Sequence, residues 1–309
     1  MLSIHQIQND VFGNYVIQKL LEVGTSDMKD KLKQSLVGQV VPLSKMIYGC
    51  RVVQKALDSL DNEDIAAVVR EFKGNLVECI LDQNGNHVIQ KCIEVFNFRA
   101  KSADSIGDSD TAIFLRQNCQ CIIDTSLESL PMLSCHPFGC RVIQRIIEHC
   151  VEPNFTRVLD TISACHTDIL DDQYGNYVIQ HLLQYGRVSD KETIMRTVLA
   201  SGLVKLSRQK YASNVVEKLL KYGTSMVRSM IIKEMLKEAD TETGTSAVLL
   251  MVRDAYANYV VQTALDVAPE GHIKKNFVQE LNNHTSQLVR FPPCLFCVTF
   301  HAECSALSF

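Results

Sequence analysis

One pattern of apolar and polar positions recurs along the chain, and its first copy is FGNYVIQKLLEVG at residues 12–24. Successive residues of an α-helix are turned by about 100°. On such a helix Asn14, Tyr15 and Gln18 lie on one face. The opposite face of this copy carries only apolar side chains: Val16, Ile17, Leu20 and Leu21. In all seven copies these four columns contain only Val, Ile, Leu, Ala or Cys, so the pattern predicts a helix with one buried face.

The copies recur at a nearly constant interval. Each is marked by the Gln or Glu at the fifth position of the Asn-Tyr-x-x-Gln motif: Gln18, Gln54, Gln90, Gln144, Gln180, Glu217 and Gln262. Four of the six intervals between these markers are 36 or 37 residues, and the others are 54 and 45. A period in this range is typical of a solenoid, in which each repeat packs only against its neighbours.

The segments between the copies supply further helices. SDMKDKLKQSLVGQV follows Gly24 and SDKETIMRTVLASGLV follows Gly186, and both glycines suit the left-handed position just after a helix. Ser189 and Glu192 predict a capping box at the start of the second segment. No alternating strand pattern with hairpin turns is evident. We therefore expect an all-α, curved α-solenoid with roughly three helices per repeat.

Two connections are longer than the repeat period requires. Residues 97–118, NFRAKSADSIGDSDTAIFLRQN, are rich in Ser, Asp and Gly in their middle, which predicts an exposed loop insertion that could carry a regulatory phosphorylation. Residues 240–246, DTETGTS, mark a second long connection between the last two copies.

Three polar columns of the motif hold a restricted set of residues, and we call the three residues of one copy a trio. The first column holds only Asn, Cys or Ser, and the second holds planar groups. The third, four residues after the first, holds Gln in six copies and Glu217 in the seventh. A merely solvated face would carry scattered Lys and Glu instead. Planar groups at a regular spacing suit stacking on nucleobases, which is worth about 1–3 kcal/mol per base.

The other members of a trio suit the edge of a base. The amides of Asn and Gln can donate to the acceptors of uracil and accept from its donor. A Gln amide fits the donor and acceptor of adenine, and a small Cys leaves room for a purine. The carboxylate of Glu217 can accept from both N1–H and N2–H of guanine. A good bidentate contact gives about 1–3 kcal/mol of discrimination.

Charge supports a polyanionic ligand at this face. The whole chain has a formal net charge of −4, which argues against binding by bulk charge alone. A fourth polar column directly follows the third. Within these four columns only Glu217 is acidic, and seven residues are basic: Lys19, Arg51, Lys55, Lys91, Arg141, Arg145 and Lys218. A basic stripe on an acidic body is the electrostatic pattern expected for a phosphate backbone.

Composition limits the compartment and the class of protein. No apolar run reaches the roughly 18 residues of a membrane span, and the N-terminus lacks the pattern of a signal peptide. Twelve Cys without an export signal predict reduced thiols, and we expect a cytoplasmic protein. Paired carboxylates and a nucleophile–His pair at useful spacing are not evident, so we expect no enzyme activity and no cofactor.

With these trios the chain resembles the Pumilio (PUF) family of RNA-binding proteins over roughly residues 9–285. The resemblance implies a right-handed superhelix of three-helix Pumilio repeats of roughly 36 residues that read one base each. In that family Asn with Gln reads uracil, Cys with Gln reads adenine, and Ser with Glu reads guanine. Uracil would be read by Asn14, Tyr15 and Gln18, by Asn86, His87 and Gln90, by Asn176, Tyr177 and Gln180, and by Asn258, Tyr259 and Gln262. Adenine would be read by Cys50, Arg51 and Gln54 and by Cys140, Arg141 and Gln144, and guanine by Ser213, Asn214 and Glu217.

The resemblance also implies a biological role. The family binds RNA antiparallel to the chain, so the implied site is 5′-UGUAUAU-3′. Family members of this kind bind 3′ untranslated regions (3′ UTRs) of messenger RNAs, repress translation and promote decay. They recruit a deadenylase complex and Nanos-type corepressors, and no membrane is involved.

The ends of the chain depart from the family pattern. We expect a Pumilio homology domain at 1–288 with about seven repeats, of which the N-terminal one is truncated because the family typically has eight. Residues 289–309 form an atypical C-terminal tail with two prolines, where a capping helix pair is expected. Because solenoids need polar end caps, we expect weaker stability and self-association at this end.

Other interpretations fit the sequence less well. The tail contains four potential zinc ligands, but their spacing matches no established pattern and we expect no metal site: Cys294, Cys297, His301 and Cys304. An armadillo- or HEAT-like protein-binding scaffold would also be a solenoid, but it gives no reason for the lone Ser213 and Glu217 copy. A sequence-tolerant ribosome-biogenesis relative is disfavoured by the nearly uniform trios.

Overall fold

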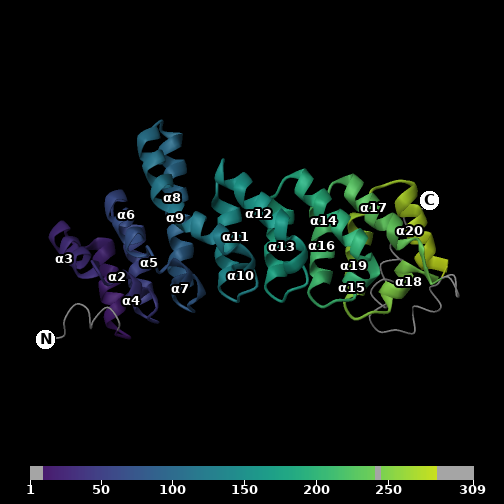
Figure 1. Ribbon diagram of the computed structural model, residues 1–309, viewed down its shortest axis with the longest axis horizontal. Coiled ribbons are helices and arrows are strands. Elements are labelled where there is room, and N and C mark those ends of the chain that lie inside the picture. Colours follow the sequence, from purple (N-terminus) through teal and green to yellow (C-terminus); the bar gives the residue numbers. More distant parts are fainter. Residues whose placement is uncertain (1–9, 241–244, 284–309) are drawn as a thin grey trace. The chain divides into compact units, whose positions relative to one another are not determined.

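The computed structural model describes residues 10–240 and 245–283, and these residues form stacked helices (Figure 1). They divide into two compact units, residues 1–161 and 162–309. The expected all-α solenoid fold is confirmed in both units. A repeat consists of a helix that carries a trio, which we call the reader helix, then a second helix, and a short helix that precedes the next reader helix. Within the described residues, the short helix is missing between α12 (Asn154–Ile169) and α13 (Gly175–Tyr185).

The first unit contains four reader helices: α2 (Gly13–Val23), α5 (Gly49–Ser59), α8 (Gly85–Ser105) and α11 (Gly139–His149). The second helices of its repeats are α3 (Ser26–Leu36), α6 (Asn62–Glu71), α9 (Ser109–Glu128) and α12 (Asn154–Ile169), which runs into the second unit. The short helices are α4 (Val40–Ser44), α7 (Leu76–Leu81) and α10 (Leu130–Ser134). Adjacent reader helices pack against one another, from α2 through α5 and α8 to α11.

The second unit repeats this order. Its reader helices are α13 (Gly175–Tyr185), α16 (Ala212–Tyr222) and α19 (Ala257–Val267). Its other helices are α14 (Val188–Ser201), α15 (Leu203–Ser207), α17 (Ser225–Met235), α18 (Ala247–Val252) and α20 (His272–Asn283). Here α13 packs on α16 and α16 packs on α19.

The apolar columns of the motif form the core, as the helical pattern predicts, except that Val16 in α2 is 57% exposed. In α5 all four positions are completely buried: Val52, Val53, Ala56 and Leu57. Burying a side chain of this kind contributes about 1.5–3 kcal/mol for a Val or Leu. The repeated apolar columns are therefore what fixes each reader helix against the next.

The two glycines expected in the left-handed conformation are not in it. Gly24 and Gly186 have φ values of −67° and −73°, and Leu60 and Cys150 end other reader helices in the same extended conformation. The backbone conformation therefore does not require a glycine there, although a Cβ at Gly24 or Gly186 would clash with the backbone oxygen of Leu20 or Leu182. Left-handed glycines instead follow the second helices, where the chain turns into a short helix: Gly38, Gly74 and Gly202.

The capping box expected at Ser189 and Glu192 is also wrong. Helix α14 begins two residues earlier than this box implies, and Arg187 is its N-cap. The Asp190 carboxylate accepts from the Arg187 backbone N–H at 2.8 Å and pairs with the Arg187 guanidinium at 2.9 Å. Because this aspartate side chain is buried, it fixes the start of the helix more firmly than an exposed serine could.

The predicted loop insertion at 97–118 is a helical hairpin instead. Helix α8 has 21 residues where α5 has 11, and α9 has 20 where α6 has 10 (Figure 1). The polar residues in the middle of this segment do not form a long loop. One of them, Asp108, caps α9 by accepting from the Thr111 backbone N–H at 3.1 Å. Apolar side chains at helical spacing bury one face of the added turns: Phe96, Ala100, Ala103, Ala112 and Leu115.

The second long connection contains a short antiparallel pair that the sequence did not predict. Strand β1 (Glu238–Asp240) pairs with β2 (Thr245–Ser246), and Ser246 donates to a carboxylate oxygen of Glu280 at 2.7 Å. The C-terminal tail and its four potential zinc ligands lie outside the described residues. Within the described ranges, no helix is both long and apolar enough to cross a membrane.

A single arginine ties the lengthened α8 to the preceding repeat. The Arg99 guanidinium donates to the backbone oxygens of Leu57, Asp58 and Leu60, at 3.1, 2.9 and 2.8 Å. It also donates to Asn62 Oδ1 at 3.0 Å. These carbonyls lie at the C-terminal end of α5, where a helix leaves its last backbone acceptors unpaired. Arg99 therefore caps a helix of another repeat.

We predict that Arg99→Met, which keeps the aliphatic stem, lowers the free energy of unfolding by about 1.5–3 kcal/mol, as expected for lost hydrogen bonds to a charged group. Urea denaturation followed by circular dichroism measures this change. The matched control is Arg196→Met, because the exposed Arg196 bonds only within its own helix. Equal stability of the two variants would contradict the capping role.

Candidate nucleic-acid interface

The trios lie at the start of the reader helices, and their three members sit at three depths. The second member is exposed in six trios, including Tyr15 at 69%, and it is half-buried at Asn214. The third member is half-buried throughout. The first member is at most 4% exposed in every trio: Asn14, Cys50, Asn86, Cys140, Asn176, Ser213 and Asn258. Within each unit, neighbouring trios therefore share nearly the same arrangement of buried, half-buried and exposed members.

The burial of the first column corrects one expectation. Cys50 and Cys140 were assigned to a surface column, but they are buried, and burial raises the pKa of the Cys50 thiol. The first position lies at the border of the apolar face, where adjacent helices cover it. Its residue type therefore acts mainly through volume and internal hydrogen bonds.

In the four Asn trios, the asparagine orients the glutamine. Asn86 donates both Nδ2 protons to backbone oxygens, those of Asp82 at 2.8 Å and Gln83 at 3.0 Å. Its Oδ1 accepts from Gln90 Nε2 at 2.8 Å. The same three hydrogen bonds occur at Asn14, Asn176 and Asn258. This arrangement leaves each glutamine with its Oε1 and one N–H for a ligand, which is an acceptor beside a donor.

The first Cys trio holds its glutamine differently. Gln54 Nε2 donates to the backbone oxygen of Cys50 at 3.1 Å, because the thiol offers no amide oxygen. The Cys50 thiol lies 3.4 Å from the backbone oxygen of Ile47. The residue of the first column therefore decides where the glutamine amide is anchored, and the smaller thiol leaves more space beside it.

An aspartate four residues before each asparagine is a site residue that our sequence analysis missed. The Asp82 carboxylate accepts from the backbone N–H groups of Asn84 and Gly85 at 2.8 and 2.7 Å, and so caps the N-terminus of α8. The same capping occurs at Asp10, Asp172 and Asp254. The equivalent position holds Met46, His136 and Gln209 in the other copies, so the signal was visible in the sequence.

Glu217 carries the one carboxylate among the trios, and an ionised carboxylate only accepts hydrogen bonds. Glu217 is half-buried, and burial raises the pKa of its carboxyl, while Lys221, the Thr263 side chain and Lys218 act against this rise. Thr263 is a buried residue of α19, and its side chain favours the ionised form of this carboxylate from the next repeat. Ser213 Oγ donates to the Lys210 backbone oxygen at 3.3 Å. A carboxylate suits a ligand edge with two adjacent donors.

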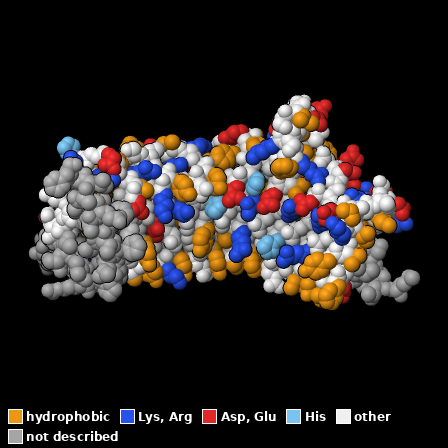
Figure 2. Space-filling view, turned by 180° about the vertical axis from the view of Figure 1, so that it is seen from behind, with side chains coloured by type: hydrophobic (Ala, Val, Ile, Leu, Met, Phe, Trp, Pro, Cys, Tyr) orange, Lys and Arg blue, Asp and Glu red, His pale blue; other side chains and the backbone are white. Residues whose placement is uncertain are grey.

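The basic stripe expected from the sequence is partly neutralised. In the first unit, three of its cations pair with an acidic residue on the preceding reader helix: Lys55 with Glu22 at 3.4 Å, Lys91 with Asp58 at 2.8 Å, and Arg145 with Glu94 at 3.1 Å. We call these pairs the ion ladder. Figure 2 shows basic side chains interleaved with acidic ones on one face instead of a uniformly basic surface. The sequence count missed the ladder because its acidic members lie four residues after the third column.

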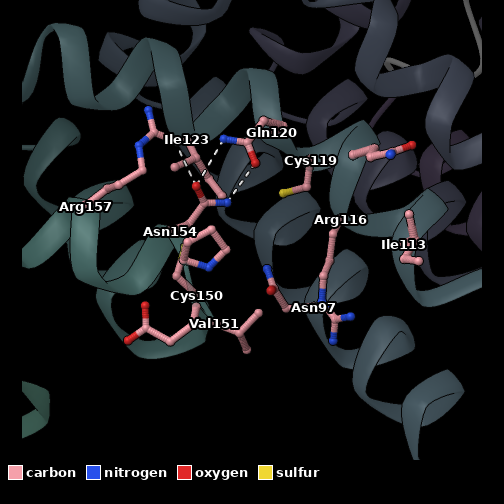
Figure 3. A pocket seen from close by; sticks show the side chains of 13 residues that line it. Asn97, Ile113, Arg116, Cys119, Gln120, Ile123, Cys150, Val151, Asn154 and Arg157 are labelled. Atoms are coloured by element: carbon pink, nitrogen blue, oxygen red, sulfur yellow. Dashed lines mark hydrogen bonds between the residues drawn. The ribbon is translucent and has the colours of Figure 1, made fainter. Parts of the chain in front are cut away.

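A cavity of about 530 Å³ beside α9 is separate from the trios (Figure 3). The amides of Gln120 and Asn154 pair with each other at 2.7 and 3.2 Å, and Arg157 donates to Asn154 Oδ1 at 2.9 Å. These polar groups satisfy one another across α9 and α12, so the cavity wall stabilises the stack and offers few free groups to a ligand.

We predict that Thr263→Val raises the pKa of the Glu217 carboxyl further, because it removes a hydroxyl that stabilises the ionised form. The measurement is a carboxyl titration by nuclear magnetic resonance on the free protein. Thr263→Ser keeps the donor and serves as the control. An unchanged or lower pKa in the valine variant would show that the hydroxyl does not stabilise the ionised carboxylate.

The comparisons with known proteins agree with this geometry. Seven segments match the Pumilio-family RNA binding repeat: 9–34, 39–72, 75–102, 130–163, 172–199, 203–236 and 248–281. A Pumilio domain-containing protein of Schizosaccharomyces pombe is 32% identical over 260 residues, covering 84% of this chain and 34% of the relative. The suppressor protein MPT5 of Saccharomyces cerevisiae is 31% identical over 288 residues, covering 84% of this chain and 31% of the relative. The chain thus spans about a third of the length of these relatives.

Solved structures show the same fold. PUF-8 in complex with PBE-RNA has a TM-score of 0.82 at 31% identity, covering 97% of this chain and 81% of that chain. The Puf3 RNA binding domain bound to a Cox17 RNA 3′ UTR recognition sequence also has a TM-score of 0.82, at 33% identity, covering 96% and 83%. The chain therefore belongs to the Pumilio family of RNA-binding repeat proteins.

Proposed function

We propose that this protein binds single-stranded RNA sequence-specifically, with one base at each trio. The observation that carries the proposal is the repeated three-depth arrangement, in which an exposed planar group lies beside a half-buried amide or carboxylate. The planar group can stack on a base while the half-buried group contacts its edge. The similar solved structures PUF-8 and Puf3 are described as complexes with RNA, which supports the same ligand class here.

The trios predict the sequence 5′-UGUAUAU-3′ for the RNA. The oriented glutamine of each Asn trio offers the acceptor and donor that match N3–H and O4 of uracil. The glutamine of a Cys trio has space beside it for the larger adenine. The Glu217 carboxylate suits the two adjacent donors of guanine. Direction along the chain follows the antiparallel order of the family.

We further propose a role in messenger RNA regulation. Binding to 3′ UTR elements, repression of translation, promotion of decay, and recruitment of a deadenylase complex and Nanos-type corepressors follow from the family resemblance. The description of Puf3 with a 3′ UTR sequence supports the ligand part of this role. Nine cysteines in the described part of the chain are free thiols, which suits a cytoplasmic location.

We predict that the protein binds UGUAUAU at least tenfold more tightly than UUUAUAU, following the energy of one bidentate contact. The double change Ser213→Asn with Glu217→Gln reverses the preference, because it replaces the carboxylate with an amide. Competition binding with labelled RNA measures both affinities. Ser189→Asn with Glu192→Gln makes the same chemical changes on α14 and leaves the preference intact. Equal affinities for both RNAs would refute the base assignment.

We predict that removing the acidic members of the ion ladder increases the salt dependence of RNA binding. In the triple variant Glu22→Gln, Asp58→Asn, Glu94→Gln, Lys55 and Lys91 become available to phosphates, whereas Arg145 keeps its pair with Glu148. The slope of log K against log salt should steepen by about 1.4, since each of the two released cations contributes about 0.7 on a single strand.

The control for this prediction has the same net charge. It changes three exposed acidic residues that lie outside the ladder: Asp27→Asn, Glu63→Gln and Asp110→Asn. Identical slopes for the two triple variants would mean that the paired cations do not reach the RNA backbone.

A further inference from the structure

A second cavity, of about 460 Å³, lies beside the trios of the first unit. Its lining includes residues from α8 and α11: Lys91, Glu94, Val95, Phe98, Arg145 and His149. We call it the α8–α11 pocket. Its volume is within the usual range for small-ligand sites. No trio residue lines it, so one-base-per-repeat reading does not use it.

The pocket begins directly beside two trios. Lys91 follows Gln90, and Arg145 follows Gln144, which are the third members of neighbouring trios. Phe98 comes eight residues after Gln90 and is rotated by about 80° from it, so it projects from an adjacent side of α8, just over two turns further along the helix. The link between the pocket and the RNA path is therefore its rim, because Lys91 and Arg145 each lie one residue from a trio.

Phe98 exists in this position only because α8 is long. The other reader helices have 11 residues and end before the equivalent position. The side chain of Phe98 is 72% exposed, although α8 and α9 bury other aromatic and aliphatic groups. A large ring left in water on the wall of a cavity is a platform on which a base can stack.

The charges at the pocket suit a nucleotide. Lys91 pairs with Asp58, and Arg145 pairs with both Glu94 and Glu148, so the two carboxylates that line the pocket, Asp58 and Glu94, are each matched by a cation. Burial, and then the neighbouring Arg145, lower the pKa of His149, so this ring is neutral near pH 7. A pocket with paired charges, apolar groups at Val95 and Phe98, and two cations at its rim fits a flat base with its phosphate outside.

We propose that the α8–α11 pocket receives the base of an extra nucleotide inserted between the bases read by α11 and α8, with Phe98 as the stacking surface. The lysine and arginine at the rim contact the phosphate of that nucleotide. This proposal rests on the proposed function, because it requires the RNA to follow the trios. It adds a subsite that accepts a base without reading its identity.

The experiment compares three RNAs by equilibrium binding. They are UGUAUAU, UGUAGUAU with one inserted guanosine, and the same eight-nucleotide RNA with an abasic residue at the insertion. We expect wild-type protein to bind the guanosine insertion about tenfold more tightly than the abasic insertion, which corresponds to about 1.4 kcal/mol. Phe98→Ala abolishes this difference and leaves the affinity for UGUAUAU unchanged.

Two further variants sharpen the test. Ile106→Ala removes another exposed apolar side chain, 80% exposed, from the connection between α8 and α9, and it should retain the tenfold difference. Phe98→Leu keeps an apolar side chain without the aromatic face and should lose most of the difference. A thermal melt of each variant establishes that it is folded.

Each alternative outcome has a distinct meaning. Equal binding of the guanosine and abasic insertions by wild-type protein overturns the proposal, and so does a Phe98→Ala effect of the same size on all three RNAs. If Phe98→Ala changes the affinity for none of the RNAs, the pocket is not an RNA subsite. This outcome would be expected if the exposed ring instead belonged to a protein-binding surface. Failure of the proposed function itself is recognised separately, because UGUAUAU would then bind no better than a scrambled heptamer.

Discussion

Lateral packing of one reader helix on the next is the interaction on which the rest of the structure depends. The branched and aliphatic side chains of the apolar columns fill the space between helices, so neither rotation nor translation of a single helix is free. The depth of every trio residue follows from this packing. The first column packs against the neighbouring helix, the third is half-buried, and the second reaches solvent in all trios but that of Asn214.

In this geometry the buried groups orient the half-buried and exposed groups, which are the ones that can contact a ligand. Asn86 donates both of its N–H groups to backbone oxygens, and its own side-chain oxygen accepts from Gln90. The buried residue thereby sets the orientation of the group that meets the ligand. Preorganisation of this kind reduces the entropy lost on binding, and it explains why the first column tolerates only small polar or thiol side chains.

Much of the fold could be predicted from the sequence, because the repeat, the apolar columns and the trio spacing are local patterns. The residues outside this pattern were misjudged where a distant partner decides the outcome. The burial of Cys50 depends on the adjacent repeat, and the pairing of Lys91 with Asp58 joins two helices. The polar stretch before Ser109 was interpreted as a loop because the helix cap of Asp108 and the buried face behind it are visible only in three dimensions. The base assignments stay a prediction, because they concern an RNA that this structure does not contain.

The aspartate that precedes each Asn trio has a consequence for how such proteins can be recoded. Asp82 caps α8 with its carboxylate and anchors Asn86 with its backbone oxygen, so one residue serves both the helix start and the amide orientation. Suppose that only the trio residues of a repeat are exchanged to change its base preference. The loop that anchors the first trio member would then still be that of the original repeat. The natural unit of exchange is therefore a nine-residue cassette from the aspartate to the third trio member, residues 82–90 in this repeat. Evolutionary drift in base preference should accordingly leave correlated substitutions at both ends of that cassette.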